Sequence, residues 1–271
     1  MNDRVRIEID SCGVADVCMV RGDKMNALDA AMFEALAAAI DRLKTEAGLR
    51  VVLLHGEGKA FCAGLDMGRF EKMGDGQDAA LSRLGPRTHG ISNAPQYVAW
   101  GWRELPVPVI AAVHGVAFGG GLQVALGGDV RLVTPDTKMS VMEIKWGLVP
   151  DMAGMVLMRS LLRDDVAREL TYSGRVVLGE EAVRIGLATR ACADPLAQAR
   201  EMAQAMAQRS PSAIRTAKQL FNQASGLTDA GAAALLQAES NAQAALIGAP
   251  HQREAVRANL ERRNPSFGPA A

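Results

Sequence analysis

The stretch that decides the fold is Lys59-Ala60-Phe61-Cys62-Ala63-Gly64-Leu65-Asp66, and it has a downstream counterpart in Gly115-Val116-Ala117-Phe118-Gly119-Gly120-Gly121. Each stretch is a loop of small residues that leads into a predicted helix. The first turn of a helix carries backbone N–H groups without intrahelical acceptors and a partial positive charge. Two such helix starts, brought together, would form a pocket with two donors for a developing oxyanion.

Strands and helices alternate around these two loops. Apolar residues that alternate over residues 5–20 predict a β-hairpin. Asp29 is the expected N-cap of a helix that ends near Leu43, since apolar residues recur there at helical spacing. Buried strands are expected at 51–54, 107–113, 129–133 and 138–141, with a helix through Leu126 after the triple glycine. This spacing of strand, helix and strand is typical of right-handed parallel crossovers.

The remaining sequence is mostly helical in pattern. A helix is expected from about Asp66, with an interruption at Met73–Gly76 and a continuation over 79–103. Beyond Met152 the expected helices cover 155–162, 165–172, 179–185, 195–208, 211–224, 229–247 and 252–263. We therefore expect an α/β core over residues 1–190 and a helical region over 191–271.

Composition excludes several classes of protein. Lys and Arg together number 30, and Asp and Glu together also number 30. This balance argues against a nucleic-acid partner, because binding to phosphates needs a basic protein surface. The four scattered cysteines fit neither a metal site nor a disulfide framework. The N-terminus does not read as a signal peptide, and no apolar run is long enough to span a membrane. These patterns favour a cytoplasmic protein without a metal.

Together with three further segments, the two loops resemble the crotonase superfamily, the enoyl-CoA hydratase/isomerase family. The further segments are Lys24–Leu28, Leu178–Leu187 and Leu260–Phe267. The resemblance implies the crotonase spiral of ββα units, with a C-terminal helical region for oligomerisation and for covering the acyl pocket. It also implies an acyl-CoA thioester substrate, no cofactor beyond the coenzyme A of that substrate, and a homotrimer or a hexamer of two trimers.

The same resemblance assigns backbone and binding roles. The N–H groups of Ala63 and Gly120 would form the oxyanion hole that holds the thioester oxygen as it becomes an enolate. The stretch Gly64–Asp66 would pass beside the adenine of coenzyme A. The residues expected to bind substrate are Lys24, Ala27, Ala60, Gly64, Leu65 and Asp66.

Proton transfer is expected to depend on Glu143. Hydratases of the family that use two glutamates carry them at the positions of Gln123 and Glu143 in this sequence. An amide cannot take up or release a proton at useful pH, so Gln123 would orient substrate or water instead. Burial would raise the pKa of Glu143 and suit it to act as a base. Asp151 is a candidate second acid, because dienoyl-CoA isomerases of the family carry an acid at this offset.

Other interpretations of these residues stay open at this point. Glu143 could form a surface salt bridge with Lys145 or Arg159, and Asp151 could cap a helix that starts at Met152. The expected reaction is hydration or double-bond isomerisation of an enoyl-CoA. Alternatives are thioester hydrolysis, decarboxylation, or an acyl-CoA-binding subunit without activity.

Overall fold

A β-hairpin opens the fold, as the alternating apolar residues predict. In the computed structural model, which describes residues 4–68, 84–226 and 230–267, β1 (Val5–Ile9) pairs antiparallel with β2 (Val14–Met19). Helix α1 (Ala30–Lys44) follows, after a short 3-10 helix η1 (Gly22–Lys24). The side chain of Asp29 accepts a hydrogen bond from the N–H of Met32, so the predicted N-cap is confirmed.

The hairpin is one edge of a six-stranded sheet with the order β1-β2-β3-β4-β6-β9. From β2 onward all neighbours are parallel, as the predicted crossovers require. The central strands β3 and β4 are buried along their whole length, which explains their unbroken apolar sequence. The four further strands of this sheet are β3 (Val51–Gly56), β4 (Val109–Val113), β6 (Val130–Val133) and β9 (Arg190–Ala191).

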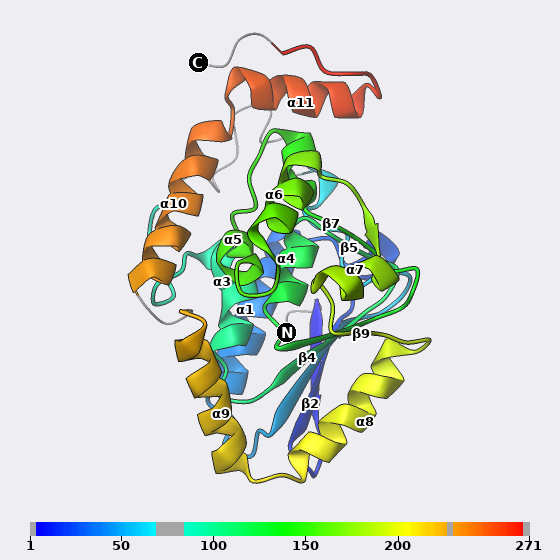
Figure 1. The fold of residues 1–271 in the computed structure, drawn as a ribbon, viewed down its shortest axis with the longest axis vertical. Coiled ribbons are helices and arrows are strands. Elements are labelled where there is room, and N and C mark those ends of the chain that lie inside the picture. The colour runs from blue at the N-terminus through cyan, green and yellow to red at the C-terminus, as the bar shows by residue number, and fades with distance from the viewer. Residues whose placement is uncertain (1–3, 69–83, 227–229, 268–271) are drawn as a thin grey trace.

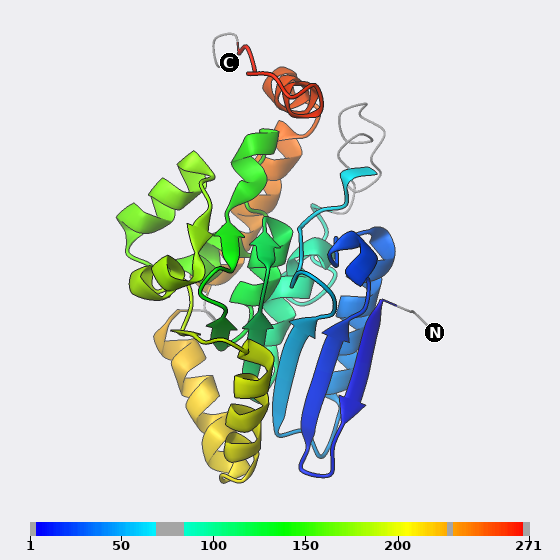
Figure 2. The same ribbon diagram turned by 90° about the vertical axis from the view of Figure 1, so that its right-hand side faces the viewer.

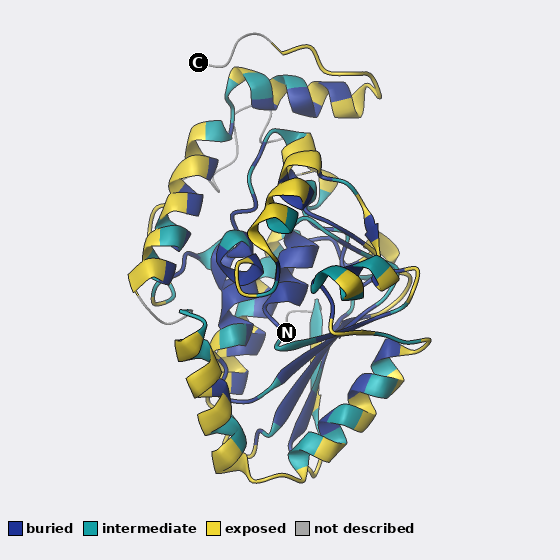
Figure 3. Cartoon of the chain, in the orientation of Figure 1, coloured by how far each residue is buried: buried dark blue, intermediate teal, exposed yellow. Residues whose placement is uncertain are grey.

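Alternate side chains of this sheet build two cores. Val52, Leu54 and Ala111 face the large core under α1 and α3 (Ala94–Glu104). Leu53 and Ala112 point to the opposite face, where α8 (Pro195–Ala207) packs. Figure 2 shows the strands β1 to β3 lying side by side, and Figure 3 shows the sheet buried between its helices.

A smaller sheet has the order β5-β7-β8, and its strand β5 belongs to the second glycine-containing stretch. Its strands are β5 (Val116–Phe118), β7 (Lys138–Ser140) and β8 (Val177–Leu178). Strand β5 lies in a stretch that the sequence predicts as loop. It is a strand because it pairs with β7 and forms a bridge between Ala117 and Cys62, contacts that are distant in sequence.

Short helices connect these strands, and two of them differ from the prediction. Of the helix expected over 79–103, residues 84–93 are not helical, and α3 begins at Ala94, where Asn93 and Gln96 form a capping box. The expected helix over 155–162 is shorter, since α5 covers Gly154–Met158. Residues 69–83 lie outside the described residues, and with them most of the helix expected from Asp66. The other short helices are α4 (Gly120–Leu126), η3 (Met142–Trp146), α6 (Asp164–Ser173) and α7 (Gly179–Ile185).

Helices complete the C-terminal part, as predicted. Besides α8, they are α9 (Pro211–Ala224), α10 (Ala230–Leu246) and α11 (Pro250–Leu260). Helix α10 runs alongside α5, and α11 packs on η3 (Figure 1). Within the part of the chain that the structure describes, no helix combines the length and apolarity that crossing a bilayer demands.

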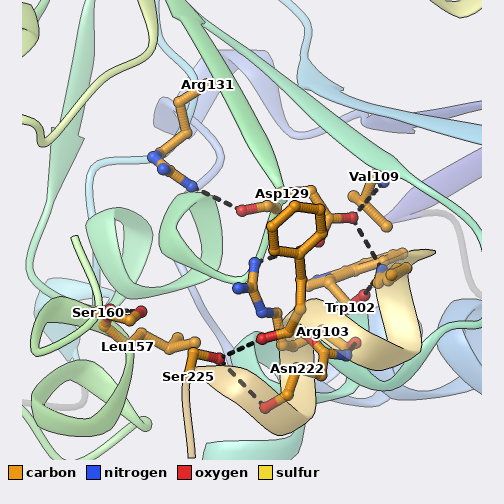
Figure 4. A network of polar contacts seen from close by, with 12 residues as sticks. Trp102, Arg103, Val109, Asp129, Arg131, Leu157, Ser160, Asn222 and Ser225 are labelled. Atoms are coloured by element: carbon orange, nitrogen blue, oxygen red, sulfur yellow. Dashed lines mark hydrogen bonds and ion pairs between the residues drawn. The ribbon is translucent and has the colours of Figure 1, made fainter. Parts of the chain in front are cut away.

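A partly buried ionic cluster around Asp129 ties α9 to the core (Figure 4). The carboxylate of Asp129 lies 2.8 Å from Nζ of Lys218 on α9 and 3.1 Å from Nη1 of Arg103 on α3, and it accepts the N–H of Val109. Lys218 also donates to the carbonyl oxygen of Val107 at 2.8 Å. Burial lowers the pKa of Lys218, so its charge depends on this carboxylate.

Replacing Asp129 by Ala should therefore lower the free energy of unfolding by about 3 kcal/mol, because it leaves two cations without their counter-ion. Urea unfolding followed by circular dichroism measures the change. Asp164→Ala, which removes an exposed ion pair with Arg168 on α6, is the matched control and should leave stability nearly unchanged. Equal stability of the Asp129 and Asp164 variants would contradict the prediction.

Candidate active site

The two glycine loops meet at the wall of a cavity of about 230 Å³. The cavity is mostly apolar, and Glu143 and Asp151 are the ionisable side chains that line it among the described residues. Predicted site residues in its wall are Ala63, Gly64, Leu65, Gly120, Glu143 and Asp151. Large apolar side chains complete it, among them Phe33, Leu84, Trp146, Leu148 and Ile247.

The loops are held together by backbone pairing. The N–H of Phe118 donates to the carbonyl of Cys62, and the N–H of Cys62 donates to that of Val116, both at 3.1 Å. Gly64 has φ of +90°, and a Cβ there would lie 2.6 Å from the carbonyl oxygen of Phe118. Only glycine fits this approach, so the two stretches lie directly against each other.

The N–H of Gly120 is free to bind a ligand. Gly120 is the first residue of α4, after Gly119 as N-cap with φ of +51°. Its N–H has no acceptor among the described residues, as is usual for the first turn of a helix. The predicted role of Gly120 as an oxyanion donor is therefore compatible with the geometry.

The predicted role of Ala63 is wrong, because its N–H already donates to the carbonyl of Met25 at 2.9 Å. The free group in this loop is the N–H of Leu65, which has no acceptor among the described residues and lies in the cavity wall. Its neighbours are fixed on both sides: the carbonyl of Gly64 accepts the N–H of Leu28, and the N–H of Asp66 donates back to Leu28. Among the described residues, the second free N–H of these loops is therefore that of Leu65.

Glu143 faces this pair of loops from η3. Its carboxylate lies against Gly119, where a Cβ would be 3.2 Å from Oε1. Nε2 of Gln123 donates to Oε1 at 2.7 Å, whereas Oε2 is buried and has no partner within the described chain. Burial raises the pKa of Glu143 to about 7. The alternative of a surface salt bridge with Lys145 or Arg159 is wrong, because this side chain is buried.

Asp151 is the second carboxyl group of the cavity. Burial raises its pKa to about 7, and repulsion from Glu143 adds to the rise. The alternative of a helix cap is wrong: α5 begins at Gly154, and its N-cap is Ala153, without a capping side chain. Two coupled carboxyl groups with raised pKa values in an apolar cavity are a frequent sign of proton-transfer chemistry.

Gln123 lies behind the cavity wall and not in it. Its Oε1 accepts the N–H groups of Met152 and Gly154, both at 2.8 Å, while its Nε2 donates to Glu143. Both acceptor positions of Oε1 and one of the two N–H donors of Nε2 are thereby used inside the protein. The expectation that Gln123 orients substrate or water is wrong; it positions Glu143 and the turn after Asp151.

Four other residues predicted to bind substrate lie outside the cavity wall. The carboxylate of Asp66 pairs with Arg21 at 2.8 Å, and Arg21 also donates to the carbonyl of Ala27. Ala60 is fully buried, and Lys24 is exposed on η1. The substrate contacts of Lys24, Ala27, Ala60 and Asp66 stay predictions.

Sequence reasoning missed two residues of α10. Glu239 is buried and accepts the N–H groups of Ala153 and Met155, both at 3.0 Å. Gln243 lines the cavity and accepts the N–H of Val149 at 3.1 Å. A signal was present, since Glu239 is the sole charged residue of Ala230–Leu246. A lone charge in an otherwise uncharged helix points to a buried partner.

Replacing Gln123 by Glu should raise the pKa of Glu143 above its value of about 7. The change keeps oxygen acceptors for Met152 and Gly154 but replaces the donor to Glu143 by a second carboxyl group. Carbon-13 NMR titration of the glutamate side chains measures the shift. Gln123→Met, which removes the donor without adding charge, should give a smaller rise, and a fall in pKa in Gln123→Glu would refute the assignment.

Comparisons with known proteins agree with this geometry. The family model described as enoyl-CoA hydratase/isomerase matches residues 10–269. The Bacillus subtilis protein YngF, named as an enoyl-CoA hydratase/isomerase, is 32% identical over 270 residues, which cover 98% of this chain and 99% of the relative. The mitochondrial methylglutaconyl-CoA hydratase of Mus musculus is 31% identical over 228 residues, with 81% of this chain and 69% of the relative covered.

Solved structures show the same fold. An enoyl-CoA hydratase from Mycobacterium avium subsp. paratuberculosis K-10 superposes with a TM-score of 0.82 at 25% identity, over 98% of this chain and 99% of that one. OdaA from Pseudomonas aeruginosa gives a TM-score of 0.82 at 26% identity, over 96% of this chain and 100% of the other. The expected crotonase-type fold is confirmed.

Proposed function

The chain belongs to the enoyl-CoA hydratase/isomerase family, and we propose that it moves the double bond of an enoyl-CoA by proton transfer through a thioester enolate. The family acts on acyl-CoA thioesters. The observation that carries the proposal is the buried Oε2 of Glu143, which has no hydrogen-bond partner among the described residues and lies beside the loop of Gly119 and Gly120.

The two backbone donors account for activation of the substrate. With the thioester oxygen between the N–H groups of Leu65 and Gly120, negative charge that develops on this oxygen is stabilised without reorganisation of the site. One such donor contributes about 3 kcal/mol to a transition state with an oxyanion. The apolar wall strengthens the effect, because it excludes water.

Glu143 then removes the proton from the α-carbon of a 3-enoyl-CoA. Its pKa of about 7 leaves it partly ionised at neutral pH and still basic enough to accept the proton. The electron pair of the broken C–H bond forms the enolate. Reprotonation at the γ-carbon, by Glu143 or by Asp151, restores the thioester carbonyl and leaves the double bond between the α- and β-carbons. Where Asp151 is the donor, Glu143 then releases its proton and Asp151 takes one up, by exchange with solvent, before the next turnover.

Gln123 favours isomerisation over hydration. Addition of water by the two-glutamate arrangement needs a second proton carrier at this position, and an amide tied to Glu143, Met152 and Gly154 cannot serve. Hydration is the second candidate. It is supported by the names of the relatives, and Asp151 offers a different second carboxyl group for activating water.

Double-bond migration moves electrons within the acyl chain, so the coenzyme A of the substrate is the only cofactor that it needs. Exposed apolar side chains, among them Tyr172, Leu220 and Phe221, offer surface for a homotrimer or a hexamer of two trimers. A cytoplasmic location also stays a prediction.

Replacing Glu143 by Gln should lower turnover at least about 100-fold, because it removes the proton carrier and keeps the shape of the side chain. Affinity for a saturated acyl-CoA should stay within about twofold. Conversion of 3-enoyl-CoA to 2-enoyl-CoA and deuterium exchange at the α-carbon are the two measurements. The control is Glu201→Gln on the exposed side of α8.

Three outcomes have separate meanings. Unchanged turnover in Glu143→Gln would remove this residue from the mechanism. Formation of a 3-hydroxyacyl-CoA by the unmodified protein, without double-bond migration, would favour hydration. Tight binding of acyl-CoA without any exchange at the α-carbon would mean a binding subunit.

A plot of kcat/KM against pH should be bell-shaped, with its maximum near pH 7. As pH increases, kcat/KM first rises because Glu143 loses its proton and only the ionised form is a base. It then falls as Asp151 loses the proton that it donates. Asp151→Asn should remove the fall on the alkaline side. A profile of kcat/KM against pH measures both limbs, and an alkaline limb that persists in the variant would exclude Asp151 as the acid.

A further inference from the structure

The turn that follows Asp151 is hydrogen-bonded to two helices, α4 and α10, that are far apart in sequence. From α4, Oε1 of Gln123 accepts the N–H groups of Met152 and Gly154. From α10, the carboxylate of Glu239 accepts those of Ala153 and Met155. Successive N–H groups therefore alternate between the two helices, and both side chains are needed to satisfy the turn.

The backbone of this turn is strained. Ala153 has φ of +67°, a left-handed conformation that costs an alanine about 1 kcal/mol. The hydrogen bond from its own N–H to Oε2 of Glu239 opposes relaxation to an ordinary conformation. Asp151, two residues before Ala153, lies in the cavity wall.

Glu239 does not itself line the cavity, so it has no contact with a substrate there. It is 4% exposed, and the groups around it are Nε2 of Gln96 at 3.4 Å, the carboxyl group of Asp151 and the guanidinium of Arg87. Burial, with repulsion from Asp151, raises the pKa of Glu239 to about 8. Burial of a carboxyl group costs free energy, and here each of its two oxygens accepts an N–H of the same turn. These hydrogen bonds hold the turn in place.

We propose that Glu239 is a positioning residue for proton transfer: by binding the N–H groups of Ala153 and Met155 it fixes Asp151 in the cavity wall. Helix α10 thereby contributes to proton transfer, because its packing against the turn sets the position of Asp151. The inference rests on the proposed function, in which Asp151 takes part in the second proton transfer and Glu143 alone performs the first.

A double-mutant cycle between Glu239 and Asp151 tests this inference. Glu239→Ala removes both acceptors, and Glu239→Gln keeps the packing and one acceptor oxygen. Each should lower kcat, by about tenfold in the Ala variant and less in the Gln variant, with KM within about twofold. In the background of Asp151→Asn, neither should lower kcat further, because the group to be positioned is already gone.

Deuterium exchange at the α-carbon separates positioning from general loosening. Exchange needs only Glu143, so the Glu239 variants should keep it within about twofold of the unmodified protein. Asn241→Ala, on the exposed side of the same helix, is the matched control and should behave like the unmodified protein. Thermal melting followed by circular dichroism shows whether each variant is folded.

Several outcomes would overturn the inference. Additive losses in the cycle, a parallel loss of exchange and turnover, or failure of both Glu239 variants to fold would make Glu239 merely structural. If these occur while Asp151→Asn alone is strongly impaired, the proposed function stands and only the inference fails. Full activity of Asp151→Asn would overturn the inference together with the proposed role of Asp151.

Discussion

The hydrogen bond from Gln123 to Glu143 is the interaction on which the site depends. It joins α4, which begins at Gly120, to η3, which carries Glu143, at a distance of 2.7 Å inside the protein. It leaves one carboxylate oxygen free and keeps the other fixed. The same amide, through Met152 and Gly154, also carries the turn of Asp151. One neutral side chain thereby links the start of α4, the carboxyl group of Glu143 and the turn after Asp151.

Much of the fold follows from local patterns in the sequence. The cap at Asp29, the buried strands and the C-terminal helices could be predicted because period and capping residues act within a few positions. Strand β5 and the start of α3 could not. The first depends on pairing with β7 and with Cys62, and the second on a reciprocal bond between Asn93 and Gln96 that overrides a weakly helical pattern.

The candidate site shows the same division. Glu143 and Asp151 could be found from side-chain chemistry and resemblance, and the structure brings both into one cavity. The proposed oxyanion donor could be placed only to within two residues, since a backbone N–H leaves no mark on side-chain identity. The N–H of Ala63 donates to Met25, whereas that of Leu65 has no acceptor among the described residues. Glu239 was missed because its role is to accept hydrogen bonds from a turn 84 to 86 residues earlier in the chain.

The two proposed donors belong to the main chain, and this has an evolutionary consequence. A point substitution at Leu65 changes the side chain but cannot delete the peptide N–H, unless it introduces proline. Acidic residues on the opposite wall, in contrast, are lost or gained by single substitutions. A scaffold of this kind keeps its capacity to stabilise an enolate during sequence divergence, while new reactions arise through changes in the carboxyl groups alone.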